Sequence, residues 1–105
     1  LISPDLAHLA GLDNAAFRVL FQASPVKRAG RDRFIRNVLI AIGNSGEIEL
    51  AAQAENLLCD PSPLVRAMAV WALLQLLDAP AFRELREKHR STENDPAVLA
   101  EWGSD

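Results

Sequence analysis

Residues 62–77 read Ser-Pro-Leu-Val-Arg-Ala-Met-Ala-Val-Trp-Ala-Leu-Leu-Gln-Leu-Leu, and this stretch decides the fold. Ser62 is a good N-cap and Pro63 suits the first position of a helix, so we expect a helix from Pro63 to about Leu77. Its only charge is Arg66, and apolar side chains occur all round it. A helix of this kind has to be covered on several sides. The stretch therefore predicts the central helix of an all-helical protein.

The same pattern occurs 31 residues earlier, where residues 34–42 align with residues 65–73. Val38 then aligns with Ala69, and a looser third copy begins at Pro96. Helix pairs that recur every 30 to 50 residues are typical of an α-solenoid, in which each pair buries its apolar face against its neighbours. We therefore predict an all-α fold of HEAT-like repeats, with about seven short helices packed as antiparallel pairs.

Helix caps, prolines and glycines divide the rest of the chain into further helices. These are expected at residues 4–10, 13–24, 31–42, 47–58, 78–90 and 95–102. No segment alternates apolar and polar residues long enough to make a convincing strand, and short connections favour antiparallel neighbours. The core is expected to contain Val38, Leu39, Ala41, Ala69, Ala72 and Leu73.

Composition bounds the class of protein. The chain has 105 residues, of which 50% are hydrophobic and 24% are charged, so we expect one globular domain over residues 1–105. It begins at Leu1 without a signal-peptide pattern, which suggests an excised domain or an already processed product. Its apolar stretches are far shorter than the ~20 residues that span a bilayer. The single cysteine, Cys59, fits a reducing compartment, and we expect a cytoplasmic protein without a membrane partner.

A short basic segment, residues 27–36, lies in an otherwise acidic chain. It contains five basic residues and one acid, whereas the rest of the chain carries a net charge of −7. A helix that starts near Arg31 would add free N–H groups and the positive end of its dipole, both of which favour a phosphate. The predicted nucleic-acid-binding residues are Lys27, Arg28, Arg31, Arg33 and Arg36. The alternative is a solvated loop whose charges pair with acids of the domain, such as Glu47 or Glu49.

Several other polar and aromatic residues are interpreted as structural. Arg66 is expected to bond the turns of a neighbouring repeat, and Trp71 and Trp102 to pack in the core. Asn37 and Asn44 could contact a ribose or a base edge, but a polar surface position and a helix end are the simpler roles for them.

The sequence contains no catalytic or metal-binding pattern. His8 and His89 share no ligand-like spacing with Cys59, which we interpret as a small filler near a helix end. There is no glycine-rich phosphate loop and no Ser/His/Asp set. We therefore predict no catalytic, cofactor-binding or metal-binding residues in this chain, and an independent enzyme is disfavoured.

Residues 24–46, followed by residues 60–66, closely resemble the C-terminal HEAT-like domain of the bacterial epoxyqueuosine reductases. The likeness runs from about Leu12 to Trp102, and residues 27–46 are its most specific part. A generic HEAT repeat would not contain that segment.

The resemblance implies a parent enzyme with two [4Fe-4S] clusters and cobalamin, which reduces epoxyqueuosine to queuosine at the wobble position of tRNA. The cluster cysteines and the cobalamin site of that family lie N-terminal to this domain, and the present chain has no Cys-x-x-Cys-x-x-Cys-x-x-x-Cys-Pro run. The expected role is an accessory domain that helps to hold tRNA, with tRNA and the catalytic domains of the parent chain as partners. The alternative is a HEAT-repeat scaffold for protein–protein interactions with no nucleic-acid role.

Overall fold

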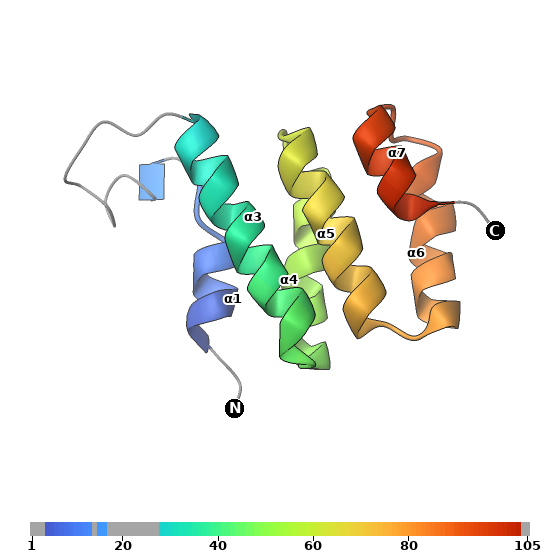
Figure 1. Cartoon of the computed structure of the whole chain (residues 1–105), viewed down its shortest axis with the longest axis horizontal. Helices are drawn as coiled ribbons and strands as arrows, with labels where there is room; N and C mark the ends of the chain where they lie inside the picture. The colour runs from blue at the N-terminus through green and yellow to red at the C-terminus, as the bar shows by residue number, and fades with distance from the viewer. Residues whose placement is uncertain (1–3, 14, 17–27, 104–105) are drawn as a thin grey trace.

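The computed structural model describes residues 4–13, 15–16 and 28–103, and over these residues all regular secondary structure is helical. The helices are α1 (Pro4–Ala10), α3 (Arg28–Ser45), the 3-10 turn η1 (Ile48–Leu50), α4 (Ala51–Asn56), the 3-10 turn η2 (Leu57–Cys59), α5 (Pro63–Leu76), α6 (Ala79–Arg90) and α7 (Pro96–Trp102). Figure 1 shows the helix pairs following one another along the stack in chain order, from α1 and α3 to α6 and α7.

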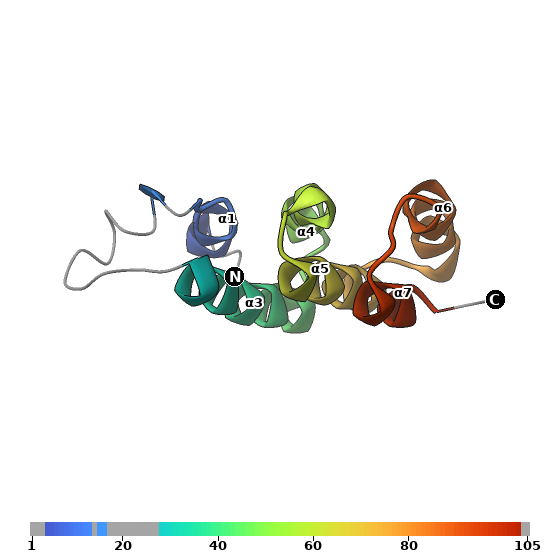
Figure 2. The ribbon, with the colours of Figure 1, turned by 90° about the horizontal axis from the view of Figure 1, so that it is seen from above.

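The helices form two layers. Seen from above, α1, α4 and α6 lie in one layer, and α3, α5 and α7 lie in the other (Figure 2). Each helix of the first layer pairs with the next helix of the second layer, and the two helices of a pair run antiparallel (Figure 1). The predicted all-α, HEAT-like stack of helix pairs is thus confirmed.

Three predicted helix starts have the expected capping hydrogen bonds. Ser62 Oγ accepts from the backbone N–H of Val65, at 3.4 Å, at the start of α5. Asp78 caps α6 and Asp95 caps α7 in the same way through their carboxylates. Each of these caps satisfies an N–H group that the first turn of a helix leaves free, and a proline follows in the first turn of each helix.

Other helix boundaries differ from the prediction. The third helix begins at Arg28 rather than near Arg31 and continues to Ser45, and Gly46 then takes a φ of 71° that suits glycine. The fourth predicted helix, residues 47–58, consists of a short α-helix flanked by 3-10 turns. Most of the helix predicted for residues 13–24 lies outside the described residues, although the Asp13 carboxylate does accept from the N–H of Ala16 at 2.8 Å.

One continuous core runs from α1 to α7. Five of the six predicted core residues are buried: Val38, Leu39, Ala69, Ala72 and Leu73. The sixth, Ala41, is exposed, so that prediction was wrong. Ala41 aligns with the buried Ala72, but α5 lies between α3 and α7, whereas among the described helices of its layer α3 has α5 on one side alone (Figure 1). Ala41 therefore falls on a face that no described helix covers.

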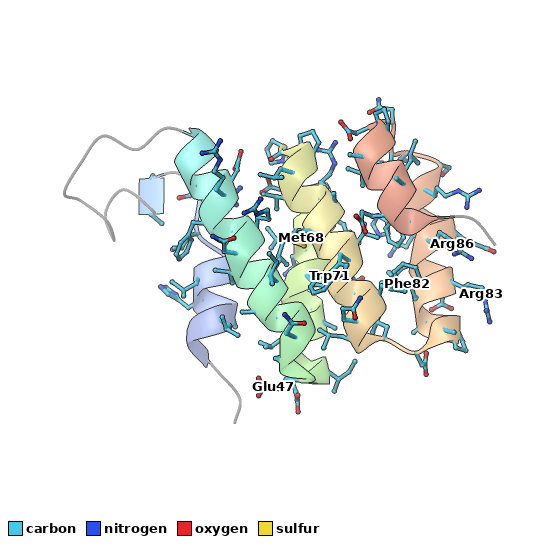
Figure 3. All side chains as sticks on the ribbon, in the orientation of Figure 1. Glu47, Met68, Trp71, Phe82, Arg83 and Arg86 are labelled. Carbon is cyan, nitrogen blue, oxygen red and sulfur yellow. The ribbon has the colours of Figure 1, made fainter. Side chains whose placement is uncertain are left out.

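Both tryptophans pack as predicted. Trp71 on α5 packs against the core and is labelled in Figure 3 next to Met68. It lies so close to α3 that a Cβ atom added at Gly43 would be 2.5 Å from its ring. Trp102 is buried, with its ring centroid 5.4 Å from that of Phe82. Cys59 is exposed, so its interpretation as a packed filler was wrong.

Candidate nucleic-acid interface

The predicted basic segment lies at the start of α3. Lys27 lies outside the described residues, and the side chain of Arg28, the first residue of α3, is also not described. The structure therefore places three of the five predicted side chains: those of Arg31, Arg33 and Arg36. They occupy different environments.

The side chain of Arg31 is buried, contrary to the prediction of an exposed phosphate ligand. Its Nε donates to the carbonyl of Leu12 at 2.8 Å. Its Nη1 lies 2.8 Å from Asp60 Oδ1 and 3.1 Å from Asp32 Oδ1. With a residue exposure of 7%, Arg31 neutralises two buried carboxylates and is not available to a polyanion in solution.

The position of Asp60 explains why the prediction for Arg31 was wrong. Asp60 lies in the loop that precedes α5, and its Oδ2 also accepts from the N–H of Ser62 at 3.0 Å. Arg31 thereby joins the segment after α1 to the loop before α5. The alternative reading, that basic residues of this segment pair with acids of the domain, holds for Arg31, although its partners are Asp32 and Asp60 rather than Glu47 or Glu49.

Arg33 and Arg36 fit the predicted phosphate-binding role better than Arg31 does. Arg33 is exposed, and Arg36 is partly buried, with its Nη2 donating to Asn37 Oδ1 at 3.2 Å. Within the described part of the chain, neither arginine forms an ion pair, and the buried Nε of Arg36 has no hydrogen-bond partner. Asn37 and Asn44 are both exposed on α3. The helical spacing of Arg33, Asn37 and Asn44 aligns them in one polar stripe along the helix.

Arg66 has the structural role predicted for it. Its Nε and Nη2 bind the two carboxylate oxygens of Glu93 at 2.9 and 3.1 Å. Its Nη1 donates to the carbonyls of Asp60 and Pro61. Arg66 on α5 therefore ties the loop before its own helix to the loop before α7.

The ion pair changes the acidity of both partners. Burial raises the pKa of Glu93, but the hydrogen bonds from Arg66 and from backbone N–H groups, together with the charge of Arg66, outweigh burial and hold that pKa below its usual value. The hydrogen bond to Glu93 raises the pKa of Arg66 against a smaller opposing effect of burial.

The starts of the three helices in the second layer differ in charge. Acids cap or immediately precede α5 and α7, namely Asp60 before α5 and Glu93 and Asp95 before α7. The first turns of all three helices lack an acid, but α3 also has none among the five residues that precede it in the sequence, residues 23–27. A polyanion would therefore meet a favourable field at the start of α3 and a less favourable one at the starts of α5 and α7.

The residues of this chain do not fit an iron–sulfur cluster. Such a cluster is generally held by four cysteine thiolates, and the chain contains one cysteine. The described residues also contain no group of three His, Cys, Asp or Glu side chains arranged to hold a metal ion. Among the described helices, none is long and apolar enough to cross a membrane.

Comparisons with known proteins agree with the fold and with the resemblance. The HEAT repeat family model matches residues 53–79, which include most of α4 and α5. The chain is 37% identical over 71 residues to an epoxyqueuosine reductase of Xanthomonas campestris pv. campestris, an alignment that covers 67% of this chain and 20% of the relative. It is 36% identical over 78 residues to an epoxyqueuosine reductase of Alicycliphilus denitrificans, covering 67% of this chain and 22% of the relative. No solved structure matches the chain significantly.

The predicted resemblance to epoxyqueuosine reductases is therefore confirmed. The chain spans about a fifth of the length of the curated relatives it matches.

Proposed function

We propose that this chain is an accessory tRNA-binding domain of a queuosine-forming reductase, and that the start of α3 contacts the phosphate backbone of the tRNA. Its similarity to two epoxyqueuosine reductases supports the enzyme context. The observation that carries the RNA contact is the exposed guanidinium of Arg33, with Arg36 one turn further along α3, neither of them paired with a described acid.

The proposed contact set is Arg33 and Arg36, with Lys27 and Arg28 as its extension toward the preceding segment. Arg31 is left out because its guanidinium is buried between Asp32 and Asp60. Arginine forks match phosphate geometry, but phosphate contacts position a nucleic acid without reading its sequence. The wobble base would therefore be recognised by other parts of the enzyme.

The chemistry of the reaction would also reside elsewhere. If the parent enzyme carries iron–sulfur clusters, residues outside this chain hold them, because the chain has a single cysteine. The family resemblance implies that a cobalamin site would lie outside this chain as well. The same free thiol fits a reducing cytoplasm as the working compartment. A protein scaffold without a nucleic-acid role is less well supported, because the relatives that match are reductases.

Charge reversal at Arg33 tests the proposal. Arg33→Glu should weaken tRNA binding about tenfold at near-physiological salt and reduce the slope of log affinity against log salt by about 1, since one phosphate contact is lost. The melting temperature should change little because Arg33 is exposed. Filter binding over a salt series measures both quantities.

Lys88→Glu is the matched control, because Lys88 is also exposed but lies on α6, at the other end of the stack. It makes the same change in net charge and should leave tRNA affinity within about twofold. The proposal fails if Arg33→Glu binds tRNA like the wild type, or if Lys88→Glu weakens binding to the same extent.

A further inference from the structure

The polar stripe of Arg33, Asn37 and Asn44 continues along α3 well beyond the proposed phosphate contact. Ala41 is exposed between the two asparagines, so the stripe lies on the face of α3 that no described helix covers. At 1.5 Å per residue, it extends roughly 16 Å from Arg33 to Asn44. A surface of that length spans more than one nucleotide of an RNA strand.

The polar stripe contains no carboxylate. The only acid of α3 is Asp32, which is buried and paired with Arg31, and the neighbouring helix α5 has no acid. The helices of the first layer, in contrast, carry several exposed acids: Glu49, Glu55, Glu84 and Glu87. A polyanion that binds at Arg33 therefore meets less repulsion along α3 than on the first layer.

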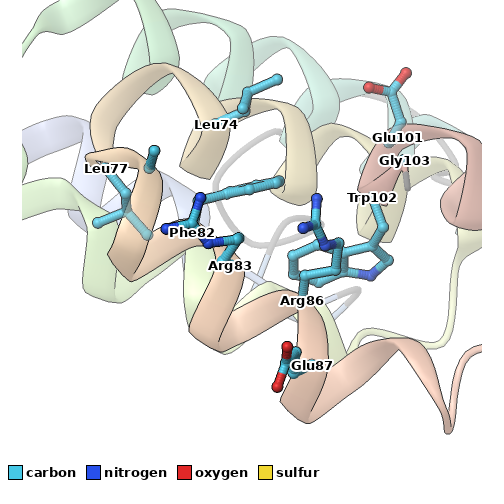
Figure 4. A pocket seen from close by; sticks show the side chains of 10 residues that line it. Leu74, Leu77, Phe82, Arg83, Arg86, Glu87, Glu101, Trp102 and Gly103 are labelled. Carbon is cyan, nitrogen blue, oxygen red and sulfur yellow. The ribbon is translucent and has the colours of Figure 1, made fainter. Parts of the chain in front are cut away.

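The cleft between α5, α6 and α7, at the other end of the stack, offers no comparable surface to a phosphate backbone. Its volume is about 690 Å³, and its lining includes Arg83 and Arg86 but also Glu87 and Glu101 (Figure 4). Two arginines and two glutamates leave no net attraction for phosphates. An RNA strand is thus expected to follow α3 rather than to cross the stack toward this cleft.

Asn44 does not form the helix end, which was the simpler role expected of it. Ser45 Oγ instead donates to the carbonyl of Ile42 at 2.6 Å and accepts from the N–H of Glu47 at 3.1 Å. Gly46 then supplies the positive φ that ends the helix. Among the described residues, none forms a hydrogen bond with the Asn44 side chain. The whole amide of Asn44 is therefore available to a ligand.

Asn37 is only partly engaged. Its Oδ1 accepts from Arg36 Nη2 at 3.2 Å, and its amide N–H groups have no partner in the described part of the chain. Asn37 lies one turn beyond Arg33, so a backbone that contacts Arg33 and Arg36 passes directly over this amide.

The two ends of the stripe suit different parts of a nucleotide. The arginines lie toward the positive N-terminal end of α3, which favours phosphates. Asn44 lies in the last turn, where no basic residue offsets the negative end of the helix dipole, so a phosphate is disfavoured there. A ribose 2′-hydroxyl is neutral, and it both donates and accepts hydrogen bonds, as an asparagine amide does.

We propose that Asn37 and Asn44 bind ribose 2′-hydroxyl groups of the RNA strand whose phosphates contact Arg33 and Arg36, so that α3 selects RNA over DNA. This inference rests on the proposed function, because the phosphate contact is what places the strand on α3. Base edges fit less well, because phosphate contacts bring the sugar–phosphate backbone, rather than the bases, against this face.

The test compares a tRNA with its all-2′-deoxy analogue in filter binding over a salt series. The wild-type chain should bind the RNA about tenfold more tightly or better, since two hydrogen bonds distinguish the two molecules. Asn44→Ala should weaken RNA binding about threefold to tenfold and leave binding of the deoxy analogue within about twofold. The slope of log affinity against log salt should stay the same, because no charge is removed.

Asn56→Ala is the matched control. Asn56 is also exposed, but it lies at the end of α4 in the first layer, and its removal should leave binding of both nucleic acids within about twofold. Asn37→Ala should act in the same direction as Asn44→Ala. Asn44 gives the cleaner result, because Asn37 is also the acceptor for the Arg36 guanidinium.

The proposal fails if Asn44→Ala binds the RNA as the wild type does, or if Asn56→Ala weakens binding to the same extent. It also fails if Asn44→Ala weakens binding of the RNA and of the deoxy analogue equally, since the ligand of Asn44 would then be a base or a phosphate. Arg33→Glu separates this inference from the proposed function. If Arg33→Glu weakens tRNA binding and Asn44→Ala does not, the ribose contact is wrong and the phosphate contact stands. If both variants bind tRNA like the wild type, both proposals are wrong.

Discussion

The two seams, which are the interfaces between neighbouring repeats, each contain an ion pair between an arginine and a carboxylate. The two ion pairs lie in different surroundings. In the first seam, Arg31 of α3 reaches Asp60 in the loop before α5. In the second, Arg66 of α5 reaches Glu93 in the loop before α7. In both, the carboxylate that binds the arginine also accepts from the backbone N–H two residues further on. One carboxylate thus fixes the start of a helix and the position of the preceding repeat.

The difference lies in burial and in how the charges are shared. The side chains of Arg31 and Asp60 are 8% and 5% exposed, and a second carboxylate, Asp32, joins them. Arg66 is 17% exposed and forms a two-pronged contact with one carboxylate. Loss of one partner should therefore cost more in the first seam, because deeply buried charges are left without compensation. The predictions below test this ranking.

The largest effect is expected for Arg31→Met. This change leaves Asp32 and Asp60 buried without their cation, and we expect the free energy of unfolding to fall by about 3–5 kcal/mol. Urea denaturation measures it. Arg33→Met, two positions along the same helix but exposed, should change stability by no more than about 0.5 kcal/mol. Equal effects of the two variants would contradict the buried ion pair.

A smaller effect is expected for Gly43→Ala, which tests how closely α3 and α5 approach in the first seam. The new Cβ would lie 2.5 Å from the ring of Trp71, so the two helices must separate or the ring must move. Overpacking of this kind outweighs the gain in helix propensity, and we expect a net loss of about 1–2 kcal/mol in the free energy of unfolding.

In thermal melts, Gly43→Ala should cost less in a Trp71→Leu background than in the wild type, because the smaller side chain leaves room for the methyl group. Asn44→Ala, the next residue of α3 and an exposed one, serves as the control and should not destabilise the chain. If Gly43→Ala destabilises the chain no more than Asn44→Ala does, α3 and α5 do not approach as closely as described.

The smallest effect concerns pH and the second seam. The pKa of Glu93 is lowered in the folded chain, so its contribution is fully present above the unfolded value of about 4.3 and is lost as pH falls through the folded value. Removing the guanidinium with Arg66→Met should make the fall in stability between about pH 5 and 3 shallower, by roughly 1 kcal/mol over that range. Urea midpoints measured across this range would show it. If stability falls with pH in the same way in the wild type and the variant, Arg66 does not lower the pKa of Glu93 as proposed.

Local sequence patterns predicted the helices well where caps and prolines mark their starts. Ser62, Asp78 and Asp95 cap the helices they were expected to cap. The same reasoning failed for Ala41, because its burial depends on whether a further helix lies beside α3 rather than on the periodicity of α3 itself. It also missed the 3-10 turns around α4, where no glycine or proline marks the change.

For the candidate site, the sequence located the basic segment but did not show which of its arginines are buried and which are exposed. Arg31 and Arg33 are two residues apart and look alike in a count of charges. One is buried in an ion-pair cluster and the other is exposed.

By itself the sequence determined the helix starts, the repeat of the apolar pattern and the likeness to epoxyqueuosine reductases, because these depend on residues within a few turns of one another or on direct alignment. The tertiary structure alone decided which charges are free. Arg31 meets Asp60, 29 residues away, only when α3 and α5 pack side by side. The hollow lined by Leu74, Phe82 and Trp102 likewise forms only where α5, α6 and α7 come together. Burial and ion pairing are set by neighbours distant along the chain, and a local pattern does not contain them.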